Sequence, residues 1–200
     1  EYSQLEILIL NGNYIKNIPS SIEKLTHLRC LILFDNKITQ ISKSVCNNLN
    51  LEYLDLRNNI LNFLPSEIGR LKKLTYLDIG RNFIDSLPSQ INSLSNLIEL
   101  HIDRNKLQIL PEKIGDLSNL NSLSIEENRI VNLPITLIRL TNLKHLTINK
   151  NKILKLPVGF SNLKNLENLF LGDNKLYYFP TDVCNIKSLK WLDVSQNEIS

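Results

Sequence analysis

A period of 23 residues organises the chain from end to end. Leucine recurs at this spacing from Leu5 to Leu189, a second leucine follows each after three residues, and Leu, Ile or Val follows two residues later. Asparagine stands eight residues after every leading leucine, from Asn13 to Asn197, and all seven prolines share one further position of the repeat. Self-similarity at a period of this length indicates a stacked repeat architecture.

The leading half of each repeat predicts a short strand, because its last two apolar residues alternate with an exposed one. The alternative is a helix, since L-x-x-L is also an i, i+3 pair on one helical face. Proline at a fixed place argues against that alternative, because it would cost about 3 kcal/mol in a helix interior. The fixed asparagine is best explained as a buried turn residue whose amide satisfies backbone groups of its own and the neighbouring coil.

The full unit is L-x-x-L-x-[LIV]-x-x-N-x-[LI]-x-x-[LIF]-P-x-x-[ILVF]-x-x-[LI], and it resembles the leucine-rich repeat family over the whole chain. The L-P-x-x-I-x-x-L half is similar to the intracellular Ras-group repeats of Ras-binding scaffolds, yeast adenylate cyclase, Scribble-type polarity proteins and plant relatives. The resemblance implies an α/β solenoid, a horseshoe with a concave parallel β-sheet and short 3-10 or irregular convex segments. At about 4.8 Å between strands, nine strands form an arc of roughly 40 Å.

We expect residues 1–200 to form a single leucine-rich repeat domain of eight full repeats plus the strand half of a ninth. The chain contains no methionine, so we expect a fragment of a longer chain, with core exposed at both ends unless something covers it. Repeat 2 departs from the pattern, since Ser42 replaces the proline and Asn48 the last core leucine. We expect its convex side, residues 42–50, to be looser or to face a partner.

Charge and cysteine content restrict the classes of function. The chain carries 23 basic and 20 acidic residues, which disfavours nucleic-acid binding, and no apolar run is long enough to span a membrane. Cys30, Cys46 and Cys184 are odd in number and far apart, unlike the cysteines of a disulfide-stapled secreted domain. We therefore expect free thiols and a cytoplasmic protein.

Functional residues are expected at the variable positions of the strand half, which face the concave side. The centre is acidic, and aromatic and arginine side chains are the usual anchors of protein interfaces; an ordinary solvated face is the alternative interpretation. The predicted partner-binding residues are Phe34, Tyr53, Asp55, Arg57, Tyr76, Asp78, Arg81, His101, Asp103, Arg104, Phe170 and Trp191. Phe170 and Trp191 are interpreted as isolated aromatics near the C-terminal end.

An apolar patch is predicted near the N-terminal end, adjoining Tyr53 and Tyr76. It consists of Ile7, Ile9, Cys30, Ile32 and Phe34. Contiguous apolar surface of this kind marks a contact, and two interpretations stay open: a preceding segment or cap covers it, or a partner does. The patch or the exposed ends could also support self-association.

No catalytic or cofactor motif stands out. Asp55, Asp78, His101 and Asp103 are the one cluster that resembles a metal or acid–base site, and repeat geometry creates such neighbours by chance. We expect no cofactor, no metal and no enzymatic activity in this region.

The favoured hypothesis is a non-catalytic module that binds a partner protein on its concave face. The family resemblance implies a role in intracellular signalling or scaffolding, with a small GTPase or signalling protein as partner. A second hypothesis is the targeting arm of a larger enzyme, such as a cyclase, kinase, ubiquitin ligase or deadenylase. A third is a parasite effector that acts on host proteins.

Overall fold

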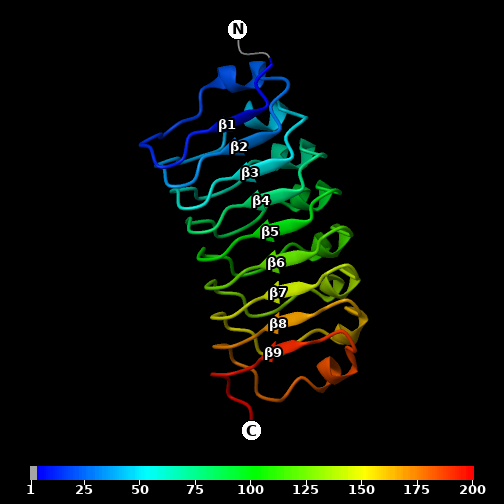
Figure 1. Cartoon of the computed structure of the whole chain (residues 1–200). Helices are drawn as coiled ribbons and strands as arrows, with labels where there is room; N and C mark the ends of the chain where they lie inside the picture. Colours follow the sequence, from blue (N-terminus) through cyan, green and yellow to red (C-terminus); the bar gives the residue numbers. More distant parts are fainter. Residues whose placement is uncertain (1–3) are drawn as a thin grey trace.

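The computed structural model describes residues 4–200 as one continuous stack of coils (Figure 1). Each of the first eight coils contains a strand, a turn and a short 3-10 helix, and the ninth contains a strand and a turn. The strands form a single parallel sheet in chain order β1 to β9. They are β1 Ile7–Ile9, β2 Cys30–Ile32, β3 Tyr53–Asp55, β4 Tyr76–Asp78, β5 Glu99–His101, β6 Ser122–Ser124, β7 His145–Thr147, β8 Asn168–Phe170 and β9 Trp191–Asp193.

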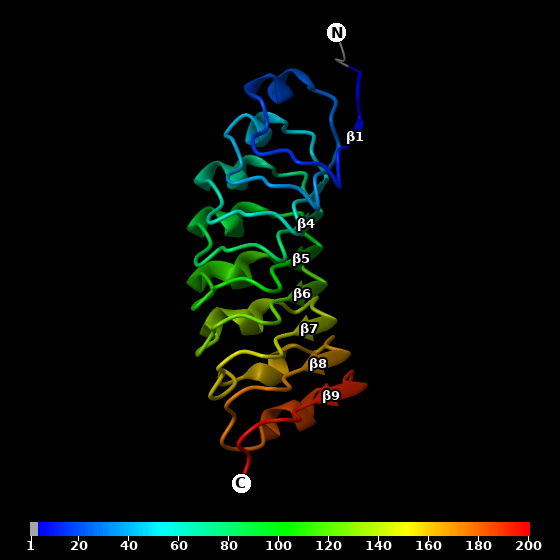
Figure 2. The same cartoon turned by 90° about the vertical axis from the view of Figure 1, so that its left-hand side faces the viewer.

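Helices of the 3-10 type form the opposite side of the stack. They are η1 Ser20–Lys24, η2 Val45–Asn47, η3 Ser66–Arg70, η4 Ser89–Ser93, η5 Glu112–Asp116, η6 Ile135–Arg139, η7 Phe160–Asn162 and η8 Thr181–Asn185. Figure 2 shows the strands along the concave side and these helices along the convex side. The predicted solenoid with a concave parallel sheet is confirmed.

Register in the sheet follows the sequence period. Residues 23 apart lie side by side on neighbouring strands, as in the pairs Tyr53–Tyr76 and Asp55–Asp78. The middle residue of each strand points inward, and Leu54, Leu77 and Leu100 are fully buried. One such coil buries its leucines only against the next coil, so the core is a continuous layer along the stack.

The asparagine ladder holds the coils together, as the sequence predicts. The Nδ2 of Asn105 donates to the carbonyl oxygens of Ile102 and Asp103 in its own coil and of Ile79 in the preceding coil. Its Oδ1 accepts the backbone N–H of Ile84 at 2.9 Å. The same pattern recurs in the neighbouring coils, so these buried amides satisfy backbone groups that the turn would otherwise leave unpaired.

Proline sets the start of the convex segments. Pro19, Pro65, Pro88 and Pro134 have extended backbone angles directly before η1, η3, η4 and η6, where the missing N–H has no cost. Ser42 stands at this position in repeat 2, where η2 has three residues. Helix η7 also has three residues although Pro157 is present in its repeat. Asn48 of repeat 2 is buried, and its Oδ1 and the Oγ of Ser42 have no hydrogen-bond partner among residues 4–200.

A left-handed residue follows each strand at the edge of the sheet. Gly12 has a φ of 69°, and eight non-glycine residues have φ between 52° and 56°. These are Asp35, Asn58, Arg81, Arg104, Glu127, Lys150, Asp173 and Gln196. The repeat imposes this conformation although L-residues disfavour it.

Candidate functional site

Two tyrosines stack at the N-terminal half of the concave face. Tyr53 of β3 and Tyr76 of β4 are register partners, and their rings lie parallel with centroids 4.2 Å apart and planes inclined by 4°. Both side chains are half-buried. Burial is the main cause that raises the pKa of each phenol, so both rings stay neutral and form a rigid wall on the sheet.

Two carboxylates lie beside this wall. Asp55 and Asp78 are only 4% and 5% exposed, although the sequence predicts them on an exposed face. The structure buries them because the Oδ1 of each accepts a backbone N–H two residues along the chain, from Arg57 at 2.9 Å and from Gly80 at 2.8 Å. This hydrogen bond compensates in part for the loss of water.

The charge of the two carboxylates is balanced incompletely. The guanidinium of Arg57 lies 3.8 Å from Oδ2 of Asp55 and 3.8 Å from Oδ2 of Asp78, and its side chain is 45% exposed. The same guanidinium lies 5.1 Å from the ring centroid of Phe34, a cation–π contact. Burial raises the pKa of both carboxyl groups above the usual 3.8, whereas the backbone hydrogen bonds and Arg57 lower it.

Seven predicted residues therefore gather in one place. We call six of them the aromatic–carboxylate cluster: Phe34, Tyr53, Asp55, Arg57, Tyr76 and Asp78. His101 borders it, with its ring centroid 5.4 Å from that of Tyr76 and its Nε2 3.2 Å from Oε2 of Glu99. Asp55, Asp78 and His101, which the sequence predicts as neighbours in one cluster, lie side by side on β3, β4 and β5 by strand register.

Arg81, Asp103 and Arg104 lie further toward the turn side. Arg81 and Arg104 are exposed, left-handed edge residues. Asp103 is half-buried, and its Oδ1 accepts the hydroxyl of Ser124 and the backbone N–H of Glu126. Arg104 pairs with Glu127 at 3.1 Å, so the three residues belong to the edge of the face rather than to the aromatic–carboxylate cluster.

Phe170 and Trp191 lie at the C-terminal end of the face, four or more strands from the tyrosines. The prediction that they are isolated aromatics is wrong. Phe170 is the register partner of Asp193, and Trp191 is that of Asn168. The two rings are therefore diagonal neighbours on adjacent strands, with centroids 6.3 Å apart and an angle of 40° between their planes. The sequence does contain this information, because large side chains at i and i+21 stand diagonally on neighbouring strands and can touch.

The apolar patch continues the aromatic–carboxylate cluster toward the N-terminal end. Ile7 and Ile9 are 58% and 59% exposed, while Cys30, Ile32 and Phe34 are half-buried. One column of the sheet runs Ile9, Ile32, Asp55, Asp78 by direct register. The concave face thus changes from apolar to acidic within four neighbouring strands.

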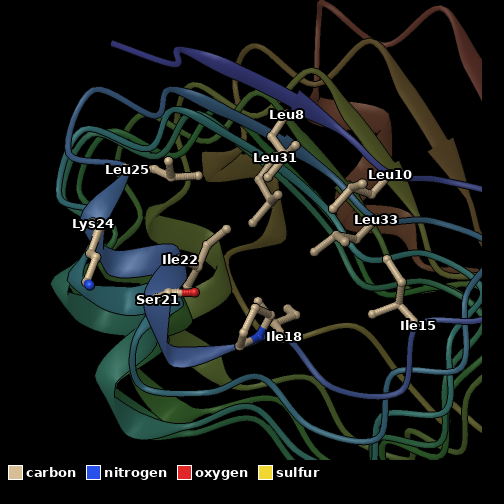
Figure 3. A pocket seen from close by; sticks show the side chains of 11 residues that line it. Leu8, Leu10, Ile15, Ile18, Ser21, Ile22, Lys24, Leu25, Leu31 and Leu33 are labelled. Carbon is tan, nitrogen blue, oxygen red and sulfur yellow. The ribbon is translucent and has the colours of Figure 1, made fainter. Parts of the chain in front are cut away.

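A cavity of about 590 Å³ opens inside the first coils, and it is distinct from the concave face. Figure 3 shows the leucines of β1 and β2 directed toward the side chains of the η1 region. The labelled residues include Leu8, Leu10, Ile18, Ile22, Leu31 and Leu33. All stand at framework positions of the repeat, so the cavity belongs to the core layer and not to a separate binding site.

The sequence patterns above do not predict a second row of structural asparagines. Each stands one residue before a leading leucine, and its Nδ2 donates to a backbone carbonyl of the preceding coil at 2.7–2.8 Å. The row consists of Asn96, Asn119, Asn142 and Asn165, with Asn50 bonded likewise. These asparagines also recur every 23 residues in the sequence. Because they are exposed, however, the pattern of buried residues does not indicate that they hold neighbouring coils together.

Residues 4–200 contain no group of three or more His, Cys, Asp or Glu side chains that could hold a metal ion. Over the same range, none of the helices has the length and hydropathy needed to cross a bilayer. Cys30, Cys46 and Cys184 are free thiols, and burial raises the pKa of Cys46 to about 12.

Comparison with known proteins places the repeats in one family. A model of the leucine-rich repeat region matches residues 36–109 and 104–200, and a leucine-rich repeat model matches residues 3–61. No curated protein sequence matches the chain significantly.

Solved structures share the fold. A leucine-rich repeat protein of Leptospira interrogans is 32% identical with a TM-score of 0.87, over 98% of this chain and 56% of that one. The ectodomain of the Arabidopsis thaliana receptor kinase GASSHO1/SCHENGEN3, solved in complex with Casparian strip integrity factor 2, is 29% identical with a TM-score of 0.89, over 96% and 24%. An internalin of Listeria monocytogenes is 25% identical with a TM-score of 0.89, over 99% and 57%. The chain therefore spans less than two thirds of each of these proteins.

Proposed function

Because the chain belongs to the leucine-rich repeat family, we propose that it is a non-catalytic module that binds a partner protein on the concave face of its sheet. The observation that carries the proposal is the aromatic–carboxylate cluster next to the apolar patch. Stacked tyrosines, an exposed arginine and contiguous apolar side chains are the residue types that dominate interface energies.

The mechanism we propose is rigid presentation. Tyr53 and Tyr76 hold each other in place, and the carboxylates beside them are fixed by backbone hydrogen bonds. Each side chain stands on a strand that is paired on both sides. Binding to such a surface orders few side chains, so little conformational entropy opposes association.

The resemblance of the L-P-x-x-I-x-x-L segments to Ras-group repeats supports an intracellular partner in signalling or scaffolding, with a small GTPase as one example. Three free thiols support a reducing compartment such as the cytoplasm. Among the similar solved structures, the leucine-rich repeat ectodomain of GASSHO1/SCHENGEN3 is in complex with Casparian strip integrity factor 2. A concave face that binds proteins is thus the shared expectation for this chain.

A recognition arm of a larger enzyme is the second candidate function. The ectodomain of a receptor kinase among the similar structures favours it, because there the repeats form one part of a longer enzyme chain. The full-length transcript distinguishes the two candidates. A catalytic domain encoded in the same reading frame supports the enzyme arm, and its absence supports the stand-alone module.

Capture of partners from native lysate tests the proposed site. Partners retained by the wild-type chain are identified and their affinities are measured against Tyr53→Ala, Tyr76→Ala and a control, Tyr178→Ala. Tyr178 is 78% exposed and lies outside the concave sheet. We expect each concave variant to weaken binding by about 1 kcal/mol or more, roughly fivefold or more, and the control to leave it unchanged. Equal affinity in all three variants would contradict the proposal.

A further inference from the structure

Resting on the proposed function, we propose a specific partner chemistry: Asp55 and Asp78 bind a lysine or arginine side chain of the partner, and the apolar patch binds a bulky apolar side chain next to it. The partner segment crosses the strands in extended form. It carries the two side chains two residues apart, in either chain direction.

Unbalanced charge is the first argument. Asp55 and Asp78 present two carboxylates with side chains only 6% exposed, and Arg57 is the cation that contacts both. Its separation of 3.8 Å from each Oδ2 exceeds hydrogen-bond length. The Oδ1 of each carboxylate accepts one backbone N–H, and the hydroxyl of Tyr76 lies 3.5 Å from the Oδ2 of Asp78. A buried carboxylate gains most from a cation that can donate directly.

Strand spacing is the second argument. Asp55 and Asp78 are direct register partners, so their backbones lie about 4.8 Å apart. One ammonium or guanidinium can donate to both carboxylates, since each hydrogen bond spans about 2.8 Å. The guanidinium of Arg57 is 45% exposed and already lies over the ring of Phe34, so this contact remains when a second cation approaches the carboxylates. An acidic partner residue at this place would meet two like charges.

The apolar patch next to the carboxylates determines where the apolar side chain of the partner lies. Ile32 and Ile9 precede Asp55 and Asp78 in the same column, one strand apart each. The middle of the carboxylate pair is therefore about one and a half strand spacings, roughly 7 Å, from Ile32. Side chains at i and i+2 of an extended segment point the same way at about 6.6 Å. An apolar and a basic residue separated by one position thus match Ile32 and the carboxylates together.

Selection from a random displayed peptide library tests this inference with the intact chain. The bait is the wild type, the double variant Asp55→Asn plus Asp78→Asn, or the control Asp193→Asn. Asp193 occupies the same column and accepts the backbone N–H of Ser195 at 2.9 Å, but its neighbour is Phe170 rather than a carboxylate. Asparagine retains the Oδ1 acceptor in every variant, and circular dichroism verifies the fold.

We expect the wild type and the control to enrich peptides with an apolar and a basic residue two positions apart, and the double variant to bind them at least tenfold more weakly. Replacing the basic residue of a selected peptide by norleucine should weaken binding to the wild type by a similar factor and to the double variant far less. Peptides that require Tyr53 and Tyr76 but show no basic enrichment would overturn the inference and leave the proposed function intact. Basic enrichment that survives in the double variant, or a failure to select any peptide, would also overturn it.

Discussion

Gly69 of η3 lies against the backbone of Gln90 in η4, so closely that a Cβ atom at position 69 would stand 2.6 Å from the carbonyl oxygen of Gln90. The obstacle is main chain and cannot rotate away. We expect Gly69→Ala to lower the free energy of unfolding by about 1–3 kcal/mol through overpacking. Ser161→Ala, at the same repeat position in η7, is the control, and urea denaturation measures both. An unchanged midpoint for Gly69→Ala would show that the neighbouring coil yields.

The buried asparagines of the ladder should contribute more to stability than the exposed asparagines of the second row. Asn105→Ala removes three donated hydrogen bonds and the acceptor for Ile84 N–H, and it leaves buried backbone groups in two coils unsatisfied. We expect a loss of about 2–4 kcal/mol. Asn96→Ala removes one exposed hydrogen bond to the carbonyl of Lys72, and we expect a loss of about 1 kcal/mol or less. Similar losses for the two variants would disprove the assigned roles.

Repeat 2 offers a stabilising change. Asn48 is buried where Leu25 and Leu71 stand in the neighbouring repeats, and its Oδ1 has no partner among residues 4–200. Asn48→Leu removes the unsatisfied acceptor and adds apolar contact, so we expect a gain of about 1–3 kcal/mol. The reverse change, Leu71→Asn, should destabilise the chain in the same denaturation assay. A loss of stability in Asn48→Leu would show that the hydrogen bonds from its Nδ2 to the carbonyl oxygens of Ser44 and Val45 outweigh the unsatisfied Oδ1.

The buried carboxylates predict a dependence of stability on pH. Burial raises the folded-state pKa of Asp55 and Asp78 above the usual 3.8, so the folded state binds protons more tightly than the unfolded state. Their contribution to stability is complete below about pH 3.8 and is lost as the pH rises through the raised values. Carboxylates with lowered pKa, such as Glu52, act in the opposite direction.

Unfolding experiments from pH 3.5 to pH 7 on the wild type and on Asp55→Asn plus Asp78→Asn isolate this effect. We expect the wild type to lose stability relative to the double variant as the pH rises. Parallel curves would mean that the two carboxyl groups titrate as exposed groups do.

The sequence predicts the repeat framework better than it predicts the contacts among variable residues on the concave face. Period, strand pattern, proline and asparagine define the coils, because each residue has the same neighbours in every repeat, and the fold follows directly. The face depends on neighbours that the period does not determine. Asp55 and Asp78 occupy variable positions of the repeat. They are nevertheless buried, with the Oδ1 of each accepting a backbone N–H from the residue two positions later. Phe170 and Trp191 occupy different positions of the repeat on neighbouring strands, and their large rings meet diagonally, which a pattern of residues 23 apart does not report.

Repeat 2 shows what the repeat pattern does not report. The sequence predicts that its convex side, residues 42–50, is looser or faces a partner, and the structure shows a three-residue η2 with Val45 and Cys46 buried. Burial persists because the apolar residues at the remaining positions still meet the coils on both sides. What the substitutions Ser42 and Asn48 change is hydrogen bonding, which apolar periodicity does not report.

The left-handed edge has a consequence for how proteins of this kind diverge. Aspartate, asparagine, arginine, glutamate, lysine and glutamine all occupy that position here with φ near 54°. The backbone demand excludes proline and penalises valine, isoleucine and threonine, but it is indifferent to the charge of an unbranched side chain. Substitutions can therefore change the charge along this edge of the sheet between related proteins while the buried leucines stay unchanged.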